Sequence, residues 1–320
     1  MQKWMLIQND QAIAGDASLY TQWKQNPGSL LWVDIEGAAD DADHTLLAER
    51  LALPEAEVRD ALRDRHPPAF SAEPGFLFLL MKPLDRESHT LDFNTQQMAI
   101  FATHNYVVTR HNKESDYLQT LWSKVSSGEH RISSPYNIVA LMARRMISRY
   151  GTILLKLEER LDEIEDTLMQ DLDEAHMQEL VGYNTALRKM RRILKYHVSV
   201  LEQLSRYSQR LKQDELSDEY EDIASQAERF NSLAELYQTV INDLIEGYIS
   251  LNSHRLNQVM RILTVVTVVF LPLSLLVGVY GMNFEYMPEL KSQNGYFILI
   301  AVMAGIASTL AYIFRRMKWL

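Results

Sequence analysis

The chain has 320 residues, no cysteine and a formal net charge of −10. The absence of cysteine excludes a disulfide framework and a thiolate metal site, and it is typical of a reducing compartment. The acidic balance makes nucleic acid a poor partner and favours cations.

Residues 1–130 mix short strand-like and helix-like segments and predict a compact α/β domain. The strand-like segments are bulky, and the first two are bounded by Gly or Pro. They are residues 29–37, 76–84 and 98–111, the last with a hairpin turn expected at His104 and Asn105. Residues 41–64 predict two short helices. Because the first residues lack the apolar run and cleavage site of a secretory signal, we expect this domain to remain in the cytoplasm.

Residues 131–215 predict long cytoplasmic helices that form an acidic helical hairpin, with a second helix from about residue 173 to 210. Apolar residues recur three and four apart as in a coiled-coil seam, namely Leu154, Leu157, Leu161, Ile164 and Leu168. A third helix is expected over residues 216–280, about 95 Å long. Helices of this length need neighbours or identical copies for stability, so we expect an oligomer.

Two nineteen-residue segments, 262–280 and 296–314, contain no charge. Each covers about 28 Å as a helix and can cross a bilayer. Five basic residues flank the pair, and one lies in the predicted outer loop of residues 281–295. The flanking residues are Arg255, Arg261 and, in the tail of residues 315–320, Arg315, Arg316 and Lys318, while Lys291 is in the loop. This asymmetry predicts that both ends of the chain are cytoplasmic.

The sequence contains none of the usual catalytic motifs, such as a nucleotide-cradling glycine loop, a serine elbow or paired histidines at zinc spacing. We therefore expect neither an enzyme nor an organic cofactor. A lone histidine on a helix, such as His197, is expected to be a packed or solvated residue rather than a ligand. The acidic residues of the first long helix are either a solvated face or a weak site for hard cations.

A stripe along one face of the first span and the residues just before it includes small and polar side chains. Stepping by three or four residues gives Asn257, Met260, Leu263, Thr267, Leu271, Ser274, Gly278 and Gly281. Tight helix packing and the lining of a pore both favour such a face. The second span has its own small-residue face at Ala301, Gly305 and Thr309, which predicts close packing there. That assignment favours pore lining for the stripe on the first span.

Asn283 follows the stripe at the expected outer mouth, where Gly281 is expected to let the chain leave helical geometry. The asparagine either caps the helix or, repeated by symmetry, forms a neutral ring of amide oxygens. Such a ring suits Mg²⁺, which gives up its water reluctantly and can be held through that water. Glu285 and Glu289 in the loop would raise the local concentration of divalent cations.

The segment "YGMNFEYMPEL" between the two spans, preceded by "LNQVMRILT" and followed by "RRMKWL", resembles the CorA family of magnesium channels and transporters. The resemblance implies a funnel-shaped homopentamer in the cell inner membrane that imports Mg²⁺ passively and also transports Co²⁺ and Ni²⁺. It implies that Gly281, Met282 and Asn283 bind the hydrated ion. It places Asn257 in the lower pore, with Met260 and Leu263 as a hydrophobic gate.

The resemblance also implies that cytoplasmic Mg²⁺ bridges subunits and closes the pore, with Asp222 at one acidic position. Ser225 and Gln226 stand where the family has a further acid and a histidine. Glu246 replaces the more usual aspartate near the membrane and is expected to pair with the basic tail. Two alternatives remain open, a zinc transporter of the same superfamily, with or without proton coupling, and a membrane-anchored scaffold or signalling protein.

Overall fold

The computed structural model describes residues 1–9, 11–63, 66–168, 174–211, 214–283, 287 and 292–319. The chain divides into two compact units, Met1–Leu244 and Ile245–Leu320, with the long helix α7 (Asp214–Tyr280) contributing to both.

The first unit is built on a seven-stranded mixed sheet. Its strands are β1 (Gln2–Gln8), β2 (Gln11–Gly15), β3 (Leu30–Glu36), β4 (Ala69–Glu73), β5 (Phe76–Met81), β6 (Met98–Thr103) and β7 (Tyr106–His111). Their order across the sheet is β2-β1-β3-β7-β6-β5-β4. The central strands β3 and β7 pair parallel, and the other neighbouring pairs are antiparallel. The central strands β3, β6 and β7 are buried along almost their whole length, so side chains alternate between two covered faces.

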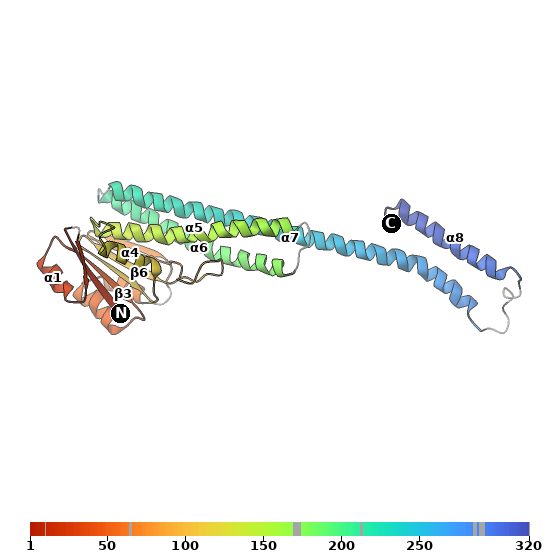
Figure 1. Ribbon diagram of the computed structural model, residues 1–320, viewed down its shortest axis with the longest axis horizontal. Helices are drawn as coiled ribbons and strands as arrows, with labels where there is room; N and C mark the ends of the chain where they lie inside the picture. Colours follow the sequence, from red (N-terminus) through yellow and green to blue (C-terminus); the bar gives the residue numbers. More distant parts are fainter. Residues whose placement is uncertain are drawn as a thin grey trace. The chain divides into compact units, whose positions relative to one another are not determined.

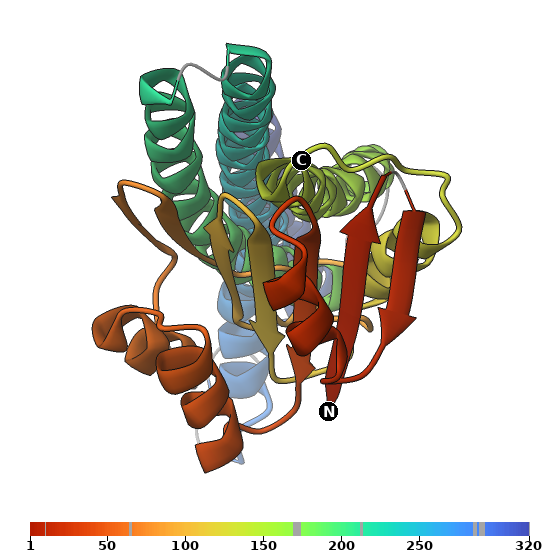
Figure 2. The same cartoon turned by 90° about the vertical axis from the view of Figure 1, so that its left-hand side faces the viewer.

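Each face of the sheet is covered by its own helices (Figure 2). Leu31, Val33 and Ile35 of β3 pack in the core beneath α1 (Leu19–Gln25), α2 (Asp41–His44), the π-helix η1 (Thr45–Arg50) and α3 (Glu55–Leu62). Leu30 and Trp32 point to the opposite face and join the core shared with α4 (Asp116–Ser126) and the long helices. The period-two alternation of β3 therefore feeds two separate hydrophobic cores.

Three long helices, α5 (Pro135–Leu168), α6 (Glu174–Arg210) and the first part of α7, lie side by side on the second face of the sheet (Figure 1). Arg160 of α5 makes a two-pronged contact with Glu179 of α6, at 2.9 Å for each nitrogen. Gly151 of α5 admits the ring of Phe230 from α7, because a Cβ there would lie 2.2 Å from the ring's Cζ atom. These contacts make the helices a bundle.

The second unit contains the rest of α7 and the helix α8 (Gly295–Arg316). Both helices are long and apolar enough to cross a membrane. Helix α7 continues through Pro272. Arg261 of α7 lies over the ring of Trp319, which follows α8, at 6.0 Å from the ring centre. Trp319 also stacks on Phe314 at 5.9 Å.

The expected fold class is confirmed, since an α/β domain is followed by long helices and two apolar C-terminal helices. The strand predictions correspond to β3, β5 and the β6–β7 hairpin. Strands β1, β2 and β4 and helices α1 and α4 were not expected from the sequence. The segment predicted as two short helices forms three elements, α2, η1 and α3.

Candidate functional site

The apolar half of α7 has two opposite faces. At about 100° per residue, the positions of the predicted stripe lie roughly opposite most of those whose side chains are partly covered. The covered face holds Val265, Val269, Pro272, Leu276 and Tyr280, and Val265 is only 8% exposed. Val265 lies one turn beyond Arg261, which contacts the ring of Trp319 after α8. The covered face of α7 is therefore the one that faces the returning chain.

The predicted stripe is exposed throughout its length. Its members are Asn257, Met260, Leu263, Thr267, Leu271, Ser274, Gly278 and Gly281. The Thr267 hydroxyl donates to the carbonyl of Leu263 at 2.8 Å. Its proton is thus engaged within the helix, and the oxygen can present lone pairs outward to a cation or its water. The stripe therefore forms one continuous surface of α7 that no other part of the described chain covers.

Helix α7 ends at Tyr280, so the chain leaves helical geometry at Gly281. The amide of Gly281 donates to the Val277 carbonyl at 2.9 Å, and the amide of Met282 donates to Val279 at 3.3 Å. Gly281 does not adopt a left-handed backbone conformation. A Cβ there would instead lie 3.1 Å from the Val277 oxygen, so the glycine serves a tight final turn rather than a change of helical hand.

Asn283 lies exposed immediately after this turn. Its side chain makes no hydrogen bond to any residue of the described ranges, so nothing there supports the capping alternative. Glu285 and Glu289 lie outside the described residues.

The small-residue face of α8, formed by Ala301, Gly305 and Thr309, does not pack against the described residues of the same chain, so its close packing stays a prediction. All three residues are exposed, and nothing lies within 4 Å of a Cβ placed on Gly305. The partly covered face of α8 instead carries large side chains, Leu299, Met303, Ile306, Leu310 and Phe314. Larger side chains span the distance between the two helices better than small ones, which require close backbone approach.

The remaining predicted residues are exposed and separate. Asp222 has no ion-pair partner among the described residues, and Ser225 beside it is exposed. Glu246 forms no ion pair with Arg315, Arg316 or Lys318 in the described part of the second unit. The expected pairing of Glu246 with the basic tail is therefore absent within one chain.

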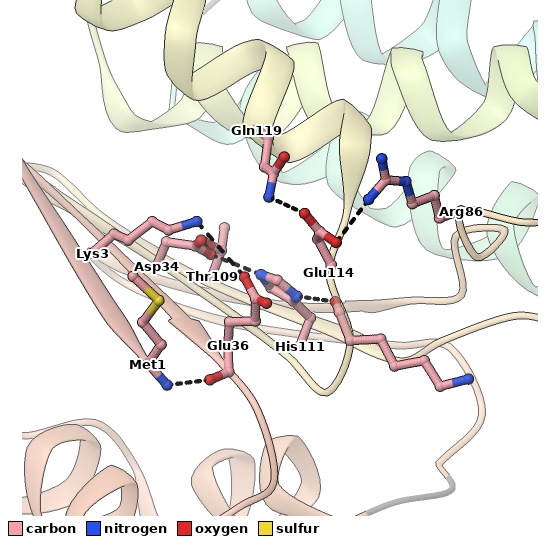
Figure 3. A network of polar contacts seen from close by, with 10 residues as sticks. Met1, Lys3, Asp34, Glu36, Arg86, Thr109, His111, Glu114 and Gln119 are labelled. Carbon is pink, nitrogen blue, oxygen red and sulfur yellow. Dashed lines mark hydrogen bonds and ion pairs between the residues drawn. The ribbon is translucent and has the colours of Figure 1, made fainter.

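A polar cluster that the sequence analysis missed lies in the first unit, on the face of the sheet covered by α4 (Figure 3). The parallel register sets Asp34 opposite Thr109 and Glu36 opposite His111. Ligand atoms of Asp34, Glu36 and His111 all lie within 4.8 Å of one another. Asp34 and His111 are almost completely buried. The only sequence signal for this cluster was two acids at alternate positions in an otherwise apolar strand.

The hydrogen bonds of the cluster are specific. Thr109 donates its hydroxyl to Asp34 Oδ1 at 2.6 Å, and His111 Nε2 lies 3.1 Å from the same oxygen. His111 Nδ1 lies 2.6 Å from the carbonyl of Lys113. Burial is the largest influence on His111 and lowers its pKa, but the hydrogen bond to Asp34 and the negative charges around it together raise the pKa above its ordinary value. The cluster therefore attracts a positive charge to Nε2.

Comparison with known proteins gives consistent matches over nearly the whole chain. The family described as CorA-like Mg2+ transporter protein matches residues 27–316. The cobalt/magnesium transport protein CorA of Methanocaldococcus jannaschii is 26% identical over 295 residues, covering 91% of this chain and 92% of its own. The protein of that name from Thermotoga maritima is 23% identical over 291 residues, covering 90% and 83%. The complete structure of the Methanocaldococcus jannaschii magnesium transporter superposes with a TM-score of 0.83 at 22% identity, covering 100% of this chain and 99% of that one, so the two share a fold.

Proposed function

Because this chain belongs to the CorA-like Mg²⁺ transporter family, we propose that it is a passive import channel for hydrated Mg²⁺, lined by the exposed stripe of α7. Copies of the chain surround a central path, as a homopentamer in the cell inner membrane with both termini in the cytoplasm. Co²⁺ and Ni²⁺, which are similar in size and hydration, pass by the same route.

The observation that carries this proposal is the opposition of the two faces of α7. Apolar side chains with Val265 among them point toward the returning chain, whereas Thr267, Ser274 and Gly278 point away from it. The hydroxyl of Ser274 makes no hydrogen bond with the described residues and is costly to expose to lipid, so this second face is best placed against identical copies or water. A closed ring of copies satisfies both requirements and leaves a path along its axis.

Asn283 supplies the chemistry at the mouth. Its amide oxygen accepts hydrogen bonds from the water shell of Mg²⁺ without requiring that the ion lose water. A carboxylate at the same position would hold the ion more strongly and slow its release. Deeper along the path, Met260 and Leu263 form an apolar constriction that can gate by excluding water, below which lies Asn257.

The membrane potential drives the transport. An inside-negative potential favours inward movement of a doubly charged ion by about 4.6 kcal/mol per 100 mV, twice the figure for one charge. No nucleotide is needed. Cytoplasmic Mg²⁺ held between subunits near Asp222 opposes opening, which makes import self-limiting. The departures at Ser225 and Gln226 make this regulation weaker than in chains that carry more acids there.

The test is Mg²⁺ uptake into liposomes that contain the purified full-length protein and an imposed potential but no ATP. We expect Asn283→Ala to lower the initial rate about tenfold or more, because loss of hydrogen bonds to a charged guest costs about 1.5–3 kcal/mol. Asn294→Ala is the matched control, since Asn294 precedes α8 in the same loop region and makes no side-chain capping bond. An unchanged rate in Asn283→Ala, with the oligomer intact, would refute the mouth assignment.

Parallel measurements separate the alternative substrates. Uptake of Mg²⁺ and Co²⁺ without a pH gradient supports the proposal. Zinc uptake that requires a pH gradient, in vesicles that ignore Mg²⁺, would identify a proton-coupled zinc transporter instead. The absence of uptake of any of these ions would favour a membrane-anchored scaffold.

A further inference from the structure

The buried cluster in the first unit has an incomplete set of hydrogen-bond donors. His111 Nδ1 faces the Lys113 carbonyl, which can only accept, so Nδ1 carries a proton. In a neutral ring Nε2 then holds a lone pair, yet its neighbour at 3.1 Å is Asp34 Oδ1, another acceptor. The ring is 1% exposed, so bulk water does not supply the missing donor. A positive charge is needed at Nε2, either a second proton or a metal ion.

The surroundings of His111 and Asp34 match those of metal ligands. A ligating histidine almost always donates its other ring N–H to a carbonyl or carboxylate, which fixes the ring and its tautomer. Asp34 is fixed in turn by Thr109, whose hydroxyl oxygen accepts from Trp32 Nε1 at 3.3 Å. Oδ2 of Asp34 accepts no hydrogen bond from the residues that the structure describes. Both side chains are therefore held in place with a lone pair to spare.

The distances suit a transition metal. Ligand atoms about 2.1 Å from a metal, at angles of about 90–110°, are about 3.0–3.4 Å apart. The 3.1 Å separation of His111 Nε2 and Asp34 Oδ1 falls in this range. An imidazole with two carboxylates is a set that Zn²⁺, Co²⁺ and Ni²⁺ accept, whereas Mg²⁺ prefers oxygen ligands alone.

Glu36 is the adjustable ligand. Its carboxylate lies 3.7 Å from the ammonium of Lys3, and both side chains are partly exposed, at 25% and 29%. Such a contact contributes little, so Glu36 can turn from Lys3 toward a metal at small cost. The α-amino group of Met1 bonds the backbone oxygen of Glu36, not its carboxylate. It does not compete for the ligand atoms (Figure 3).

We propose that Asp34, Glu36 and His111 form a binding site for one divalent transition metal ion per chain, of the Zn²⁺, Co²⁺ or Ni²⁺ class. The site lies in the α/β domain, uses a nitrogen ligand and strips water from the ion. It differs in all three respects from the proposed path for hydrated Mg²⁺ along α7. It does not depend on that path, because each chain supplies all three ligands. A metal there would tie β3 to β7 at the parallel centre of the sheet.

The test is equilibrium dialysis of the full-length protein in detergent against micromolar Zn²⁺ at pH 7.5, after chelator treatment. Wild-type protein should bind one zinc ion per chain more than His111→Gln. His104→Gln is the matched control, because His104 is exposed in the β6–β7 turn and should leave the count unchanged. Co²⁺ provides a second readout, since its visible absorption changes when an imidazole replaces water. Equal zinc counts in wild type and His111→Gln would overturn the proposal.

A more conservative substitution controls for a folding defect. Thr109→Val keeps all three ligands and removes only the hydroxyl that orients Asp34, so zinc affinity should fall about 10-fold to 100-fold. Unchanged affinity in Thr109→Val would contradict the site. Asn283→Ala should retain the zinc ion, so a failed transport test and a failed zinc test are distinguishable. If wild type binds no additional zinc even at pH 8, the charge at Nε2 is a proton and the metal site is rejected.

Discussion

Acidification should destabilise the first unit through one buried histidine, His197 of α6. Its ring is completely buried, and its Nε2 accepts the backbone N–H of Lys82 at 3.1 Å. Tyr150 of α5 packs edge-on against the ring and donates its hydroxyl to the Lys82 carbonyl at 2.5 Å. Protonation of Nε2 would turn this acceptor into a donor facing a donor. His197 is thus packed in the interior, one of the two environments expected for a lone histidine on a helix.

The magnitude follows from the pKa. Burial, with a smaller contribution from the charge of Lys82, lowers the pKa of His197 from 6.5 to about 3. His197 therefore binds a proton below about pH 6.5 in the unfolded chain, but only below about pH 3 in the folded chain. The free energy of unfolding contributed by this group falls as the pH decreases through that window, by about 1.4 kcal/mol per pH unit. Between pH 6.5 and pH 5 the loss is about 2 kcal/mol.

The assay compares wild type with His197→Gln, which can still accept from Lys82 but does not titrate. Urea unfolding of the full-length protein in detergent is followed by tryptophan fluorescence, since Trp4, Trp23, Trp32 and Trp122 all lie in the first unit. Other groups titrate equally in both proteins, so the difference between their free energies of unfolding reports the titration of His197 alone. Wild type should lose about 2 kcal/mol relative to the variant between pH 6.5 and 5. A difference that stays constant over this range would refute the reasoning, and the exposed His104→Gln should behave as wild type does.

Two further predictions concern the helix bundle. Gly151→Ala places a Cβ against the ring of Phe230 and should lower the free energy of unfolding by about 1–3 kcal/mol. The smaller side chain in Phe230→Leu should recover part of this loss, as measured by urea midpoints, and additive losses in the double variant would contradict the predicted clash. Arg160→Gln removes the two-pronged contact with Glu179. Because Arg160 is 39% exposed, the free energy of unfolding should fall by only about 1 kcal/mol or less, and by less still at about 0.5 M salt. A loss of stability that does not depend on salt would contradict an electrostatic origin.

The long helices and the two spans could be predicted because their signals are local. Nineteen uncharged residues, or an apolar seam such as Leu154 to Leu168, impose the same structure whatever lies elsewhere in the chain. Strands β3, β5, β6 and β7 could be predicted for the same reason, because each carries a bulky apolar run. Strand β4 (Ala69–Glu73) and strand β2 (Gln11–Gly15) lie at the two edges of the sheet, are less buried and carry weaker patterns. Their pairing comes from tertiary context rather than from local preference.

The cluster around His111 could not be found in this way. It depends on the parallel pairing of β3 with β7, which brings together residues more than seventy positions apart in the sequence. Asp34 and Glu36 alternate with apolar neighbours, which places them on the face of Trp32, but nothing local shows that Thr109 and His111 extend the same row. Acids on a strand that otherwise feeds two cores are the one local signal that points to such a cluster.

The polar residues of α7 differ in how much they support a pore. Thr264 and Thr267 bond carbonyls of their own helix at 2.7 and 2.8 Å, and Thr309 of α8 does the same at 2.8 Å. A hydroxyl satisfied in this way faces lipid at little cost, so the threonines alone do not separate a pore face from a lipid face.

Ser274 separates the two faces better than the threonines do. It lies on the exposed stripe, and its hydroxyl makes no hydrogen bond with the described residues. Within the apolar segment of residues 262–280, lipid cannot satisfy such a hydroxyl. Asn257 and Asn283 lie outside that segment, where water satisfies their amides with or without a pore, so they do not distinguish the two faces. Ser274 therefore favours a face of α7 that meets water, an ion's hydration shell or other copies of the chain.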